Sequence, residues 1–309
     1  MSKTALLFAG QGAQVVGMGK DLAESFPSAK AWFERANSIV GCDLTSICFG
    51  GPEAELTKTE NAQPGIFLVS WVAFQLLKEK APALAFEATA GLSLGEFTAL
   101  AAAEAMSFED GLRLVRQRGR FMQEACDATQ GGMAAIVGLD EGPTREVCAQ
   151  AGVVLANLNC PGQLVISGEM DKITQACDLA KAKGARRAVP LPVAGAYHSP
   201  LMSSAQVKLK SELDKIAFKN PSVPVVSNVN AQPHTDVDSI RKRLVDQVTS
   251  SVRWEESMRY LLAQGFDRFI ELGPGTALSG FMKRIDKNAV ILNVADAGSL
   301  ETTLKSLGG

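Results

Sequence analysis

The chain has 309 residues, of which 46% are hydrophobic and 21% are charged, and its formal net charge is −2. This length suffices for one large domain with an insertion or for two domains, with a sizeable core in either case. The near-balance of charge provides no basic excess for wrapping nucleic acid, and the longest apolar stretch, residues 66–77, is too short to cross a bilayer. We therefore expect neither nucleic acid nor a membrane as a partner.

The cysteines and the N-terminus exclude further classes of protein. The six cysteines contain no Cys-x-x-Cys pair, and no histidine stands at ligand spacing from them. We therefore expect no metal site and no disulfide framework, and the thiols should be reduced. Because Gly10-Gln11-Gly12 interrupts the apolar N-terminus too early for a signal sequence, we expect a cytoplasmic chain.

The first predicted elements are of the α/β type. Residues 4–8 form a strand-like apolar run that ends in a glycine-rich loop, residues 9–14. This loop lacks the spacing of a phosphate-binding or dinucleotide-binding loop, so it is either a ligand loop at the end of a strand or a plain connection. Helices are predicted over residues 20–24 and 29–40, and a third is predicted to open at Pro64 and run to Lys80.

The segment Gly91-Leu92-Ser93-Leu94-Gly95 lies between a strand-like run and the helix-like residues 97–103. Gly-x-Ser-x-Gly at a strand-to-helix turn is typical of a nucleophile elbow. The serine of such a turn takes a strained backbone conformation, and the flanking glycines allow strand and helix to pack closely. Since the pattern also occurs by chance, an ordinary turn is the alternative.

Ser107 is predicted to cap a helix whose apolar positions include Val115 and Met122. Arg118 falls three residues after Val115 and four before Met122, which places it on or beside the inward face. A buried guanidinium is costly unless an anion meets it, and its planar fork suits a carboxylate. The alternatives are a structural ion pair or a side chain that reaches out to water.

Residues 128–194 change the pattern to β-α-β-β-α-β, the order of a ferredoxin-like unit. We predict that this unit is inserted into a larger α/β domain formed by residues 1–127 and 195–309. The cleft between two such domains is a favoured place for a ligand. The predicted strands cover residues 133–139, 153–157, 163–167 and 187–193, and the predicted helices cover residues 142–151 and 171–183.

The chain contains only two histidines, His198 and His234. His198 follows the inserted unit, in a loop before a helix that runs to about residue 216, where the domain cleft is expected. A lone histidine is more often structural, and His234 is predicted to lie in a surface turn. The remainder alternates again, with strands predicted at 225–228, 268–272 and 290–294 and helices at 237–248, 255–264 and 277–284.

Ser93 as nucleophile and His198 as general base indicate acyl transfer through an acyl-serine. An ordinary α/β-hydrolase places an acid after its serine and a histidine near the C-terminus. Here His198 comes mid-chain, and no acidic residue is marked by a motif. An ordinary hydrolase is therefore not favoured.

Six motifs occur in order along nearly the whole chain: FAGQGAQ at residues 8–14, GLSLGE at 91–96, Arg118-Gly119 with Met122, Asn159-x-Pro161-Gly162-Gln163, GAYHS at 195–199 and ELGPG at 271–275. Together they resemble the motifs of the malonyl-CoA:acyl carrier protein transacylase family. The resemblance implies an α/β fold, with a hydrolase-like parallel-sheet domain and an inserted ferredoxin-like domain. It also implies ping-pong malonyl transfer from malonyl-CoA to the phosphopantetheine thiol of acyl carrier protein, supplying fatty acid elongation.

The family's functional residues carry over position by position. No cofactor is implied, because the coenzyme A thioester and phosphopantetheine are substrates, and a monomer is expected. Basic residues on the surface could also be solvated side chains without a partner. The resemblance implies these roles: Ser93 is the nucleophile and His198 the base; the N–H groups of Gln11 and Leu94 form the oxyanion hole; Arg118 holds the malonyl carboxylate; Gln63, Met122 and Tyr197 line the substrate pocket; the backbone carbonyl of Gln247 orients His198; Arg186, Arg187, Lys283 and Arg284 face the acidic carrier protein.

The sequence departs from the family at three positions. Leu92 replaces a usual histidine, while Ala9 and Ala13 replace a usual proline and serine. Tyr197 stands where malonyl-selective relatives carry a bulky aromatic residue, and we expect it to exclude a 2-methyl branch. The alternatives are a serine thioesterase or esterase, which would have no use for Arg118, and an inactive acyl-carrier-binding module, which only Leu92 favours.

Overall fold

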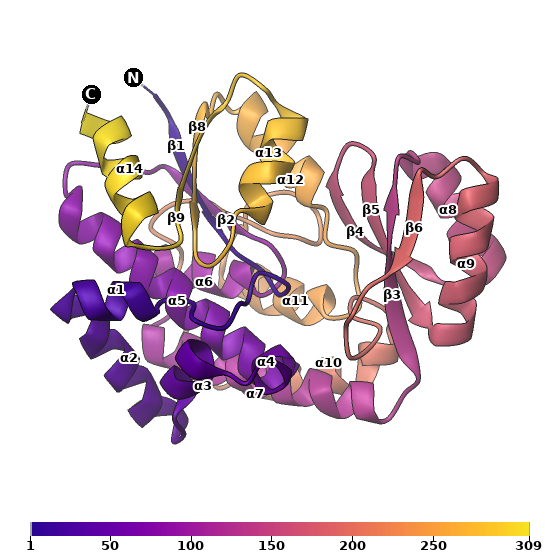
Figure 1. The fold of residues 1–309 in the computed structure, drawn as a ribbon, viewed down its shortest axis with the longest axis horizontal. Coiled ribbons are helices and arrows are strands. Elements are labelled where there is room, and N and C mark those ends of the chain that lie inside the picture. Colours follow the sequence, from indigo (N-terminus) through magenta and orange to yellow (C-terminus); the bar gives the residue numbers. More distant parts are fainter. Residues whose placement is uncertain (1, 309) are drawn as a thin grey trace.

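The chain forms two units side by side in the computed structural model, which describes residues 2–308 (Figure 1). The larger unit contains a five-stranded sheet in the order β7-β2-β1-β8-β9, and the smaller contains a four-stranded sheet in the order β4-β5-β3-β6. This arrangement confirms the predicted α/β architecture. The domain boundaries, including 128 and 194, stay predictions, and Met1 and Gly309 lie outside the described residues.

The strands of the larger sheet are β1 (Thr4–Phe8), β2 (Ala88–Gly91), β7 (Val225–Val226), β8 (Arg268–Leu272) and β9 (Val290–Val294). Those of the smaller sheet are β3 (Gly131–Val137), β4 (Val154–Cys160), β5 (Gln163–Glu169) and β6 (Arg187–Pro190). The helices are α1 (Lys20–Ser25), α2 (Pro27–Val40), α3 (Leu44–Gly50), α4 (Glu53–Thr57), α5 (Thr59–Lys80), α6 (Gly95–Ala102), α7 (Phe108–Asp127), α8 (Glu141–Ala151), α9 (Met170–Ala182), the 3₁₀ turn η1 (Pro200–Met202), α10 (Ser203–Leu213), α11 (Val237–Gln247), α12 (Trp254–Ala263), α13 (Ala277–Ile285) and α14 (Ala297–Gly308).

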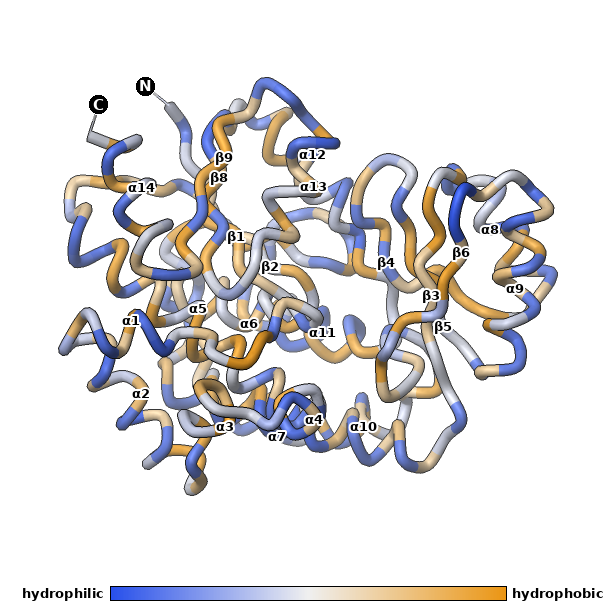
Figure 2. The backbone as a smooth tube through the Cα atoms, in the orientation of Figure 1, coloured by the Kyte–Doolittle hydropathy of each residue, from blue (hydrophilic) through white to orange (hydrophobic). Residues whose placement is uncertain are grey.

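All pairings in the larger sheet are parallel, and both of its faces are buried. Along β1, Leu6 and Phe8 pack into one core with α5 and α6, whereas Ala5 and Leu7 pack into another core with α12 and α13. Side chains alternate between the faces of a strand, so a strand covered on both faces must be apolar throughout. Figure 2 accordingly shows hydrophobic residues along β1 and β8 and hydrophilic ones on the outer turns of the helices.

The strand order brings two loops together at one edge of this sheet. β1 pairs with β2 from Ala5 and Ala88 onward, so the glycine-rich loop after β1 and the Ser93 turn after β2 are neighbours. A Cβ at Gly10 would lie 2.5 Å from the carbonyl oxygen of Leu92. The carboxyl ends of parallel strands are the usual ligand-binding edge of such a sheet.

The smaller sheet is antiparallel and has the ferredoxin-like strand order. Its helices α8 and α9 lie on the side away from the larger unit (Figure 1). Ile136 and Ile166 join the core under these helices, whereas Met133 and Val165 join the main core of the larger unit. The inner face of the smaller sheet is therefore packed against the larger unit.

The chain enters and leaves the smaller unit through closely packed glycines. A Cβ at Gly131 would lie 2.7 Å from the Cβ of Ala196, and one at Gly195 would lie 2.4 Å from Sγ of Cys126. The outgoing segment is thus held against the end of α7. This packing fixes the loop that carries His198.

The prediction that a helix opens at Pro64 was wrong, because α5 begins at Thr59 and contains Pro64 in its second turn. Packing overrides the preference of proline for the first turn. Gly119 of α7 lies so close that a Cβ there would be 2.6 Å from the Thr59 carbonyl oxygen. The extra turn brings Gln63 beside α7, where Arg118 lies.

Candidate active site

The Ser93 turn is forced by sterics at both of its glycines. A Cβ at Gly91 would lie 1.9 Å from the backbone carbon of Gly95, and one at Gly95 would lie 2.2 Å from the carbonyl oxygen of Phe8. Between them, Ser93 has φ of 52°, in the left-handed region that side chains rarely adopt. The N–H of Ser93 donates to Oδ1 of Asn228 at 2.5 Å, and the Asn228 amide donates to the Gly91 carbonyl at 2.8 Å. A neighbouring side chain therefore holds the strained turn in place.

His198 lies against the hydroxyl of Ser93. Its Nε2 atom is 2.8 Å from Oγ of Ser93, and its Nδ1 atom is 2.9 Å from the main-chain oxygen of Gln247. A carbonyl oxygen can only accept, so Nδ1 carries the proton and Nε2 is free to accept the proton of the serine. The structure thus places Gln247 at His198, as the resemblance implied, and no carboxylate is needed to orient the ring.

The environment of His198 keeps the ring neutral. Burial and then the nearby charge of Arg118 lower the pKa of His198 from 6.5 to about 4, against the opposing effect of hydrogen bonds that the ring donates to the backbone of residues 247 and 250. A neutral imidazole is the form that can remove a proton. His198 is therefore ready to act as a base at neutral pH.

Arg118 is almost fully buried, at 1% exposure, and it points at the same hydroxyl. Its Nη2 donates to Oγ of Ser93 and to Oε1 of Gln247, both at 3.0 Å, and its Nη1 donates to Oε1 of Gln63 at 2.5 Å. All three acceptors are uncharged, and Nε is buried without a partner among residues 2–308. The structural ion pair that was the alternative is therefore not what holds this arginine.

A chain of hydrogen bonds links Arg118 to the glycine-rich loop. Gln63, which accepts from Arg118, donates through its Nε2 to the Thr59 hydroxyl at 2.8 Å. That hydroxyl in turn donates to Oε1 of Gln11 at 2.9 Å. Gln63 is thus fixed at both ends of its amide. The sequence indicated separate roles for Gln63 and Gln11, whereas in the structure hydrogen bonds through Thr59 connect them.

The two remaining predicted pocket residues lie around this chain. Sδ of Met122 is 3.5 Å from Nε2 of Gln63. Tyr197 is 6% exposed, and its hydroxyl lies beside Gln11 and Cys126 without a hydrogen bond of good geometry to any described residue. Both side chains therefore limit the space near Arg118.

The predicted oxyanion-hole donors lie on the two loops that meet at the sheet edge. Leu94 is the residue before α6, so its N–H is at the positive end of that helix. Within residues 2–308, neither this N–H nor that of Gln11 has a hydrogen-bond acceptor. Both donors are thus available to an oxygen that becomes negative beside Ser93.

A cleft of about 670 Å³ between the two units reaches His198. One wall comes from α8 and β4 of the smaller unit and includes Arg145 and Leu155. The other wall comes from the segment after α11 and includes Thr249 and Arg253. The base therefore lies at the junction of the units, where the sequence placed it.

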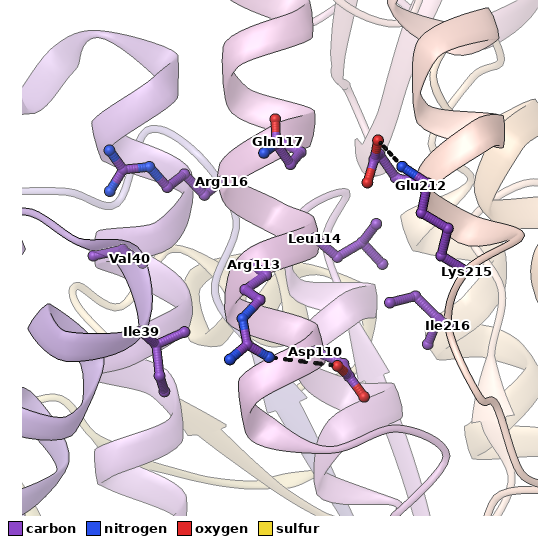
Figure 3. A pocket seen from close by; sticks show the side chains of 10 residues that line it. All are labelled: Ile39, Val40, Asp110, Arg113, Leu114, Arg116, Gln117, Glu212, Lys215 and Ile216. Atoms are coloured by element: carbon purple, nitrogen blue, oxygen red, sulfur yellow. Dashed lines mark hydrogen bonds and ion pairs between the residues drawn. The ribbon is translucent and has the colours of Figure 1, made fainter.

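A second hollow, of about 420 Å³, lies between α2, α7 and α10 (Figure 3). Four of its charged side chains form two ion pairs, Arg113 with Asp110 and Lys215 with Glu212, and the fifth, Arg116, donates to Sγ of Cys42. None of its lining residues is a predicted site residue. We therefore assign the chemistry to the Ser93 region.

The comparisons with known proteins agree with this geometry. A family model described as an acyl transferase domain matches residues 5–300. The chain belongs to the malonyl-CoA:acyl carrier protein transacylase family. The malonyl CoA-acyl carrier protein transacylase of Bacillus subtilis (strain 168) is 45% identical over 312 residues, which cover 99% of this chain and 98% of the relative.

Solved structures of the family superpose on nearly the whole chain. The malonyl CoA-acyl carrier protein transacylase of Coxiella burnetii has a TM-score of 0.96 at 36% identity and covers 100% of this chain and 98% of its own. A malonyl-transacylase in complex with a type II PKS acyl-carrier protein has a TM-score of 0.95 at 39% identity, with 99% and 100% coverage.

The family's expected carrier-facing residues are all exposed here, and two of them lie on one surface. The guanidinium of Arg284 on α13 donates to Oε1 of Gln163 at 2.8 Å and to the carbonyl of Pro161 at 3.1 Å, so it lies on the β4–β5 turn. Gly138 donates to the carbonyl of Gly162 in that turn, and a Cβ at Gly138 would lie 2.8 Å from Cβ of Arg186. Arg187 and Lys283 are chain neighbours of these two arginines.

Sequence reasoning missed a buried polar group beneath Ser93. Glu96 is 0% exposed, and its Oε1 atom is 2.9 Å from Nε2 of His234. The prediction that His234 lies in a surface turn was wrong, because its side chain is buried in contact with Glu96. An acidic residue directly after the elbow, in the first turn of the otherwise apolar helix α6, was the available signal.

No helix within the described chain has the length and apolarity needed to cross a membrane. Residues 2–308 contain no cluster of three or more ligand-type side chains arranged to hold a metal ion. The expectation that no cofactor takes part stays a prediction.

Proposed function

We propose that this chain transfers the malonyl group of malonyl-CoA to the phosphopantetheine thiol of acyl carrier protein through a malonyl-Ser93 intermediate, supplying fatty acid elongation. The observation that supports it most is the position of Arg118. A buried guanidinium with only uncharged partners lies 3.0 Å from the hydroxyl of Ser93, which itself contacts His198. An acyl group with a free carboxylate would supply the missing anion.

The first half-reaction forms the acyl-serine. Oγ of Ser93 attacks the thioester carbonyl while Nε2 of His198 takes the hydroxyl proton, and the N–H groups of Gln11 and Leu94 receive the developing oxyanion. When the tetrahedral intermediate collapses, the C–S bond breaks and the proton on His198 passes to the coenzyme A sulfur. Arg118 holds the malonyl carboxylate throughout.

The second half-reaction reverses these steps with another thiol. His198 takes the proton of the phosphopantetheine thiol, whose sulfur attacks the malonyl ester and releases Ser93. The proton then returns from His198 to the serine oxygen. Because coenzyme A leaves before the carrier protein reacts, ping-pong kinetics are expected.

A serine thioesterase or esterase is the alternative from another class of reaction. Such an enzyme would pass the acyl group to water and would gain nothing from a buried cation beside its nucleophile. Arg118 therefore argues for a carboxylate-bearing acyl group, and the relatives' names argue for transfer to a carrier protein.

We also propose that the enzyme is a cytoplasmic monomer. All six cysteines are free thiols, and five of them are buried, which fits a reducing compartment. Sedimentation of the purified protein with and without carrier protein tests the monomer, which a stable dimer of the free enzyme would contradict.

Steady-state transfer to holo-acyl carrier protein tests the proposed function. With malonyl-CoA and carrier protein varied, parallel double-reciprocal lines are expected, and Ser93→Ala should abolish both the transfer and the covalent malonyl adduct. Apo-carrier protein, which lacks the thiol, is the matched control and should accept nothing. Hydrolysis of malonyl-CoA at the same rate with and without holo-carrier protein would instead indicate a thioesterase.

A further inference from the structure

Three donors converge on the carboxylate of Glu96, directly beneath the Ser93 turn. Oε1 accepts from Nε2 of His234 at 2.9 Å, while Oε2 accepts from the N–H of Asn228 at 3.0 Å and from Nε2 of Gln247 at 2.7 Å. An ionised carboxylate only accepts hydrogen bonds, so this set of donors matches the charged form. The chain therefore holds a buried negative charge that the proposed mechanism does not use.

The side chain of Gln247 connects this charge to the binding site. Its Nε2 donates to Glu96 and to the carbonyl oxygen of Ser93, the latter at 3.0 Å, while its Oε1 accepts from Nη2 of Arg118 at 3.0 Å. The amide is thus fixed at both ends, and its orientation is set by the acidic group. With Glu96 ionised, only the Oε1 atom of Gln247 can face Arg118.

The buried guanidinium of Arg118 needs a nearby negative charge that leaves its N–H donors free. Burial lowers the pKa of Arg118 to about 10, and the charge of Glu96 opposes this effect. Among residues 2–308, Arg118 forms no ion pair with a carboxylate, and its Nε–H has no hydrogen-bond acceptor. A direct ion pair would use the same donors that the substrate carboxylate requires.

We propose that Glu96 is a positioning residue that acts on Arg118 through Gln247. It supplies a counter-charge one side chain removed, so that the guanidinium is charged and aimed at Ser93 while its donors are free for the malonyl carboxylate. Glu96 does not touch the substrate. His234 and Asn228 serve to hold the carboxylate in this position. This inference rests on the proposed malonyl transfer.

Glu96→Gln removes the charge and almost preserves the shape. The new carbonyl can occupy the Oε2 position, where two donors meet, and the new amide can face His234 if that ring presents an unprotonated Nε2. The hydrogen bond to Gln247 then survives without its charge. The variant therefore separates the electrostatic role of Glu96 from its packing.

Glu271→Gln is the matched control. Glu271 is also buried, at 1% exposure, and its carboxylate accepts from the N–H groups of Leu278 and Ser279 at 3.0 and 2.7 Å at the start of α13. Glu271→Gln should lower the melting temperature as Glu96→Gln does, because each substitution removes a buried carboxylate. Among residues 2–308, its hydrogen bonds involve no site residue.

The experiment compares loading of Ser93 from malonyl-CoA and from acetyl-CoA. For Glu96→Gln we expect the malonyl-CoA KM to rise about tenfold and the malonyl-to-acetyl preference to fall by a similar factor. The acetyl rate should stay within about twofold of wild type, since acetyl has no carboxylate for the guanidinium to bind and Glu96→Gln leaves the contact between Arg118 and Ser93 in place. Glu271→Gln should keep the wild-type preference. His234→Ala, which removes one of three donors, should give a smaller shift in the same direction and serves if Glu96→Gln does not fold.

A double-mutant cycle makes the test specific to Arg118. In an Arg118→Ala background, Glu96→Gln should not change the preference further, because the group it acts on is gone. Equal loss of malonyl and acetyl loading in Glu96→Gln, or an unchanged preference, overturns the inference while leaving the proposed function intact. Absence of malonyl loading in the wild type overturns both.

Discussion

The Nη2 atom of Arg118 lies 3.0 Å from Oγ of Ser93. A permanent positive charge is therefore in direct contact with the atom that becomes the nucleophile. This contact has two consequences. It favours the serine oxygen as its proton leaves, and it opposes a second positive charge on His198, whose pKa it helps to lower.

The pH dependence of malonyl loading should follow the lowered pKa of His198. The base is active when neutral, so a pKa of about 4 shifts the acid limb of the profile below the ordinary value of 6.5. We expect kcat/KM for malonyl-CoA to be near its plateau at pH 6 and to fall only as the pH approaches the pKa of the folded protein. Stopped-flow or quenched loading between pH 4 and 8 measures this. A midpoint near 6.5, with the fold intact by circular dichroism, would contradict it.

The glycines of the Ser93 turn should be intolerant of a side chain. A Cβ at Gly95 would lie 2.2 Å from the carbonyl oxygen of Phe8, so Gly95→Ala should lower the free energy of unfolding by more than about 3 kcal/mol and abolish loading. Gly142, in the first turn of α8, has open space around its missing Cβ and is the control. Gly142→Ala should be neutral or stabilising by up to about 1 kcal/mol in urea denaturation. Similar stability of the two variants would show that the turn can relax.

Tyr197 should govern the tolerance for a 2-methyl branch. Its side chain is buried beside Gln11, and Gln11 is connected to Arg118 by hydrogen bonds through Thr59 and Gln63. An acyl group with a 2-methyl branch should therefore clash with Tyr197. We expect wild type to load methylmalonyl-CoA at least about tenfold more slowly than malonyl-CoA, and Tyr197→Val to narrow that ratio. Comparable loading of both thioesters by wild type would refute this role.

The basic surface around the β4–β5 turn should affect only the second half-reaction. Arg186→Glu and Arg284→Glu should raise the KM for acyl carrier protein several-fold, with a dependence on ionic strength, and leave malonyl loading of Ser93 unchanged. Arg113→Glu, in the separate hollow of Figure 3, is the control and should leave both steps as they are. If none of the three substitutions alters the KM for acyl carrier protein, this surface does not bind the carrier protein.

The sequence sufficed for those parts of the site that depend on local pattern. Ser93 follows from a turn motif between a strand and a helix, and Arg118 from its spacing to Val115 and Met122 on one helix face. The position of His198 followed from the order of elements, which places it where the two units meet. The first two inferences use residues close together in the chain, and the third needs only the order of the elements.

The parts that were missed depend on contacts between distant segments. Glu96 and His234 are 138 positions apart and meet only because β7 pairs with β2. Nothing near His234 in the sequence indicates a buried partner, so it looked like a surface turn. The early start of α5 had the same kind of cause, since it depends on Gly119 of another helix. Long-range pairing of polar groups leaves little trace in local periodicity.

The most direct measurement is the intact mass of the protein after it competes for equal amounts of malonyl-CoA and acetyl-CoA, with wild type, Ser93→Ala and Arg118→Ala side by side. We expect one malonyl adduct on wild type, none on Ser93→Ala, and a change to the acetyl adduct on Arg118→Ala. A malonyl preference that survives the loss of Arg118, or an adduct that survives the loss of Ser93, would contradict it.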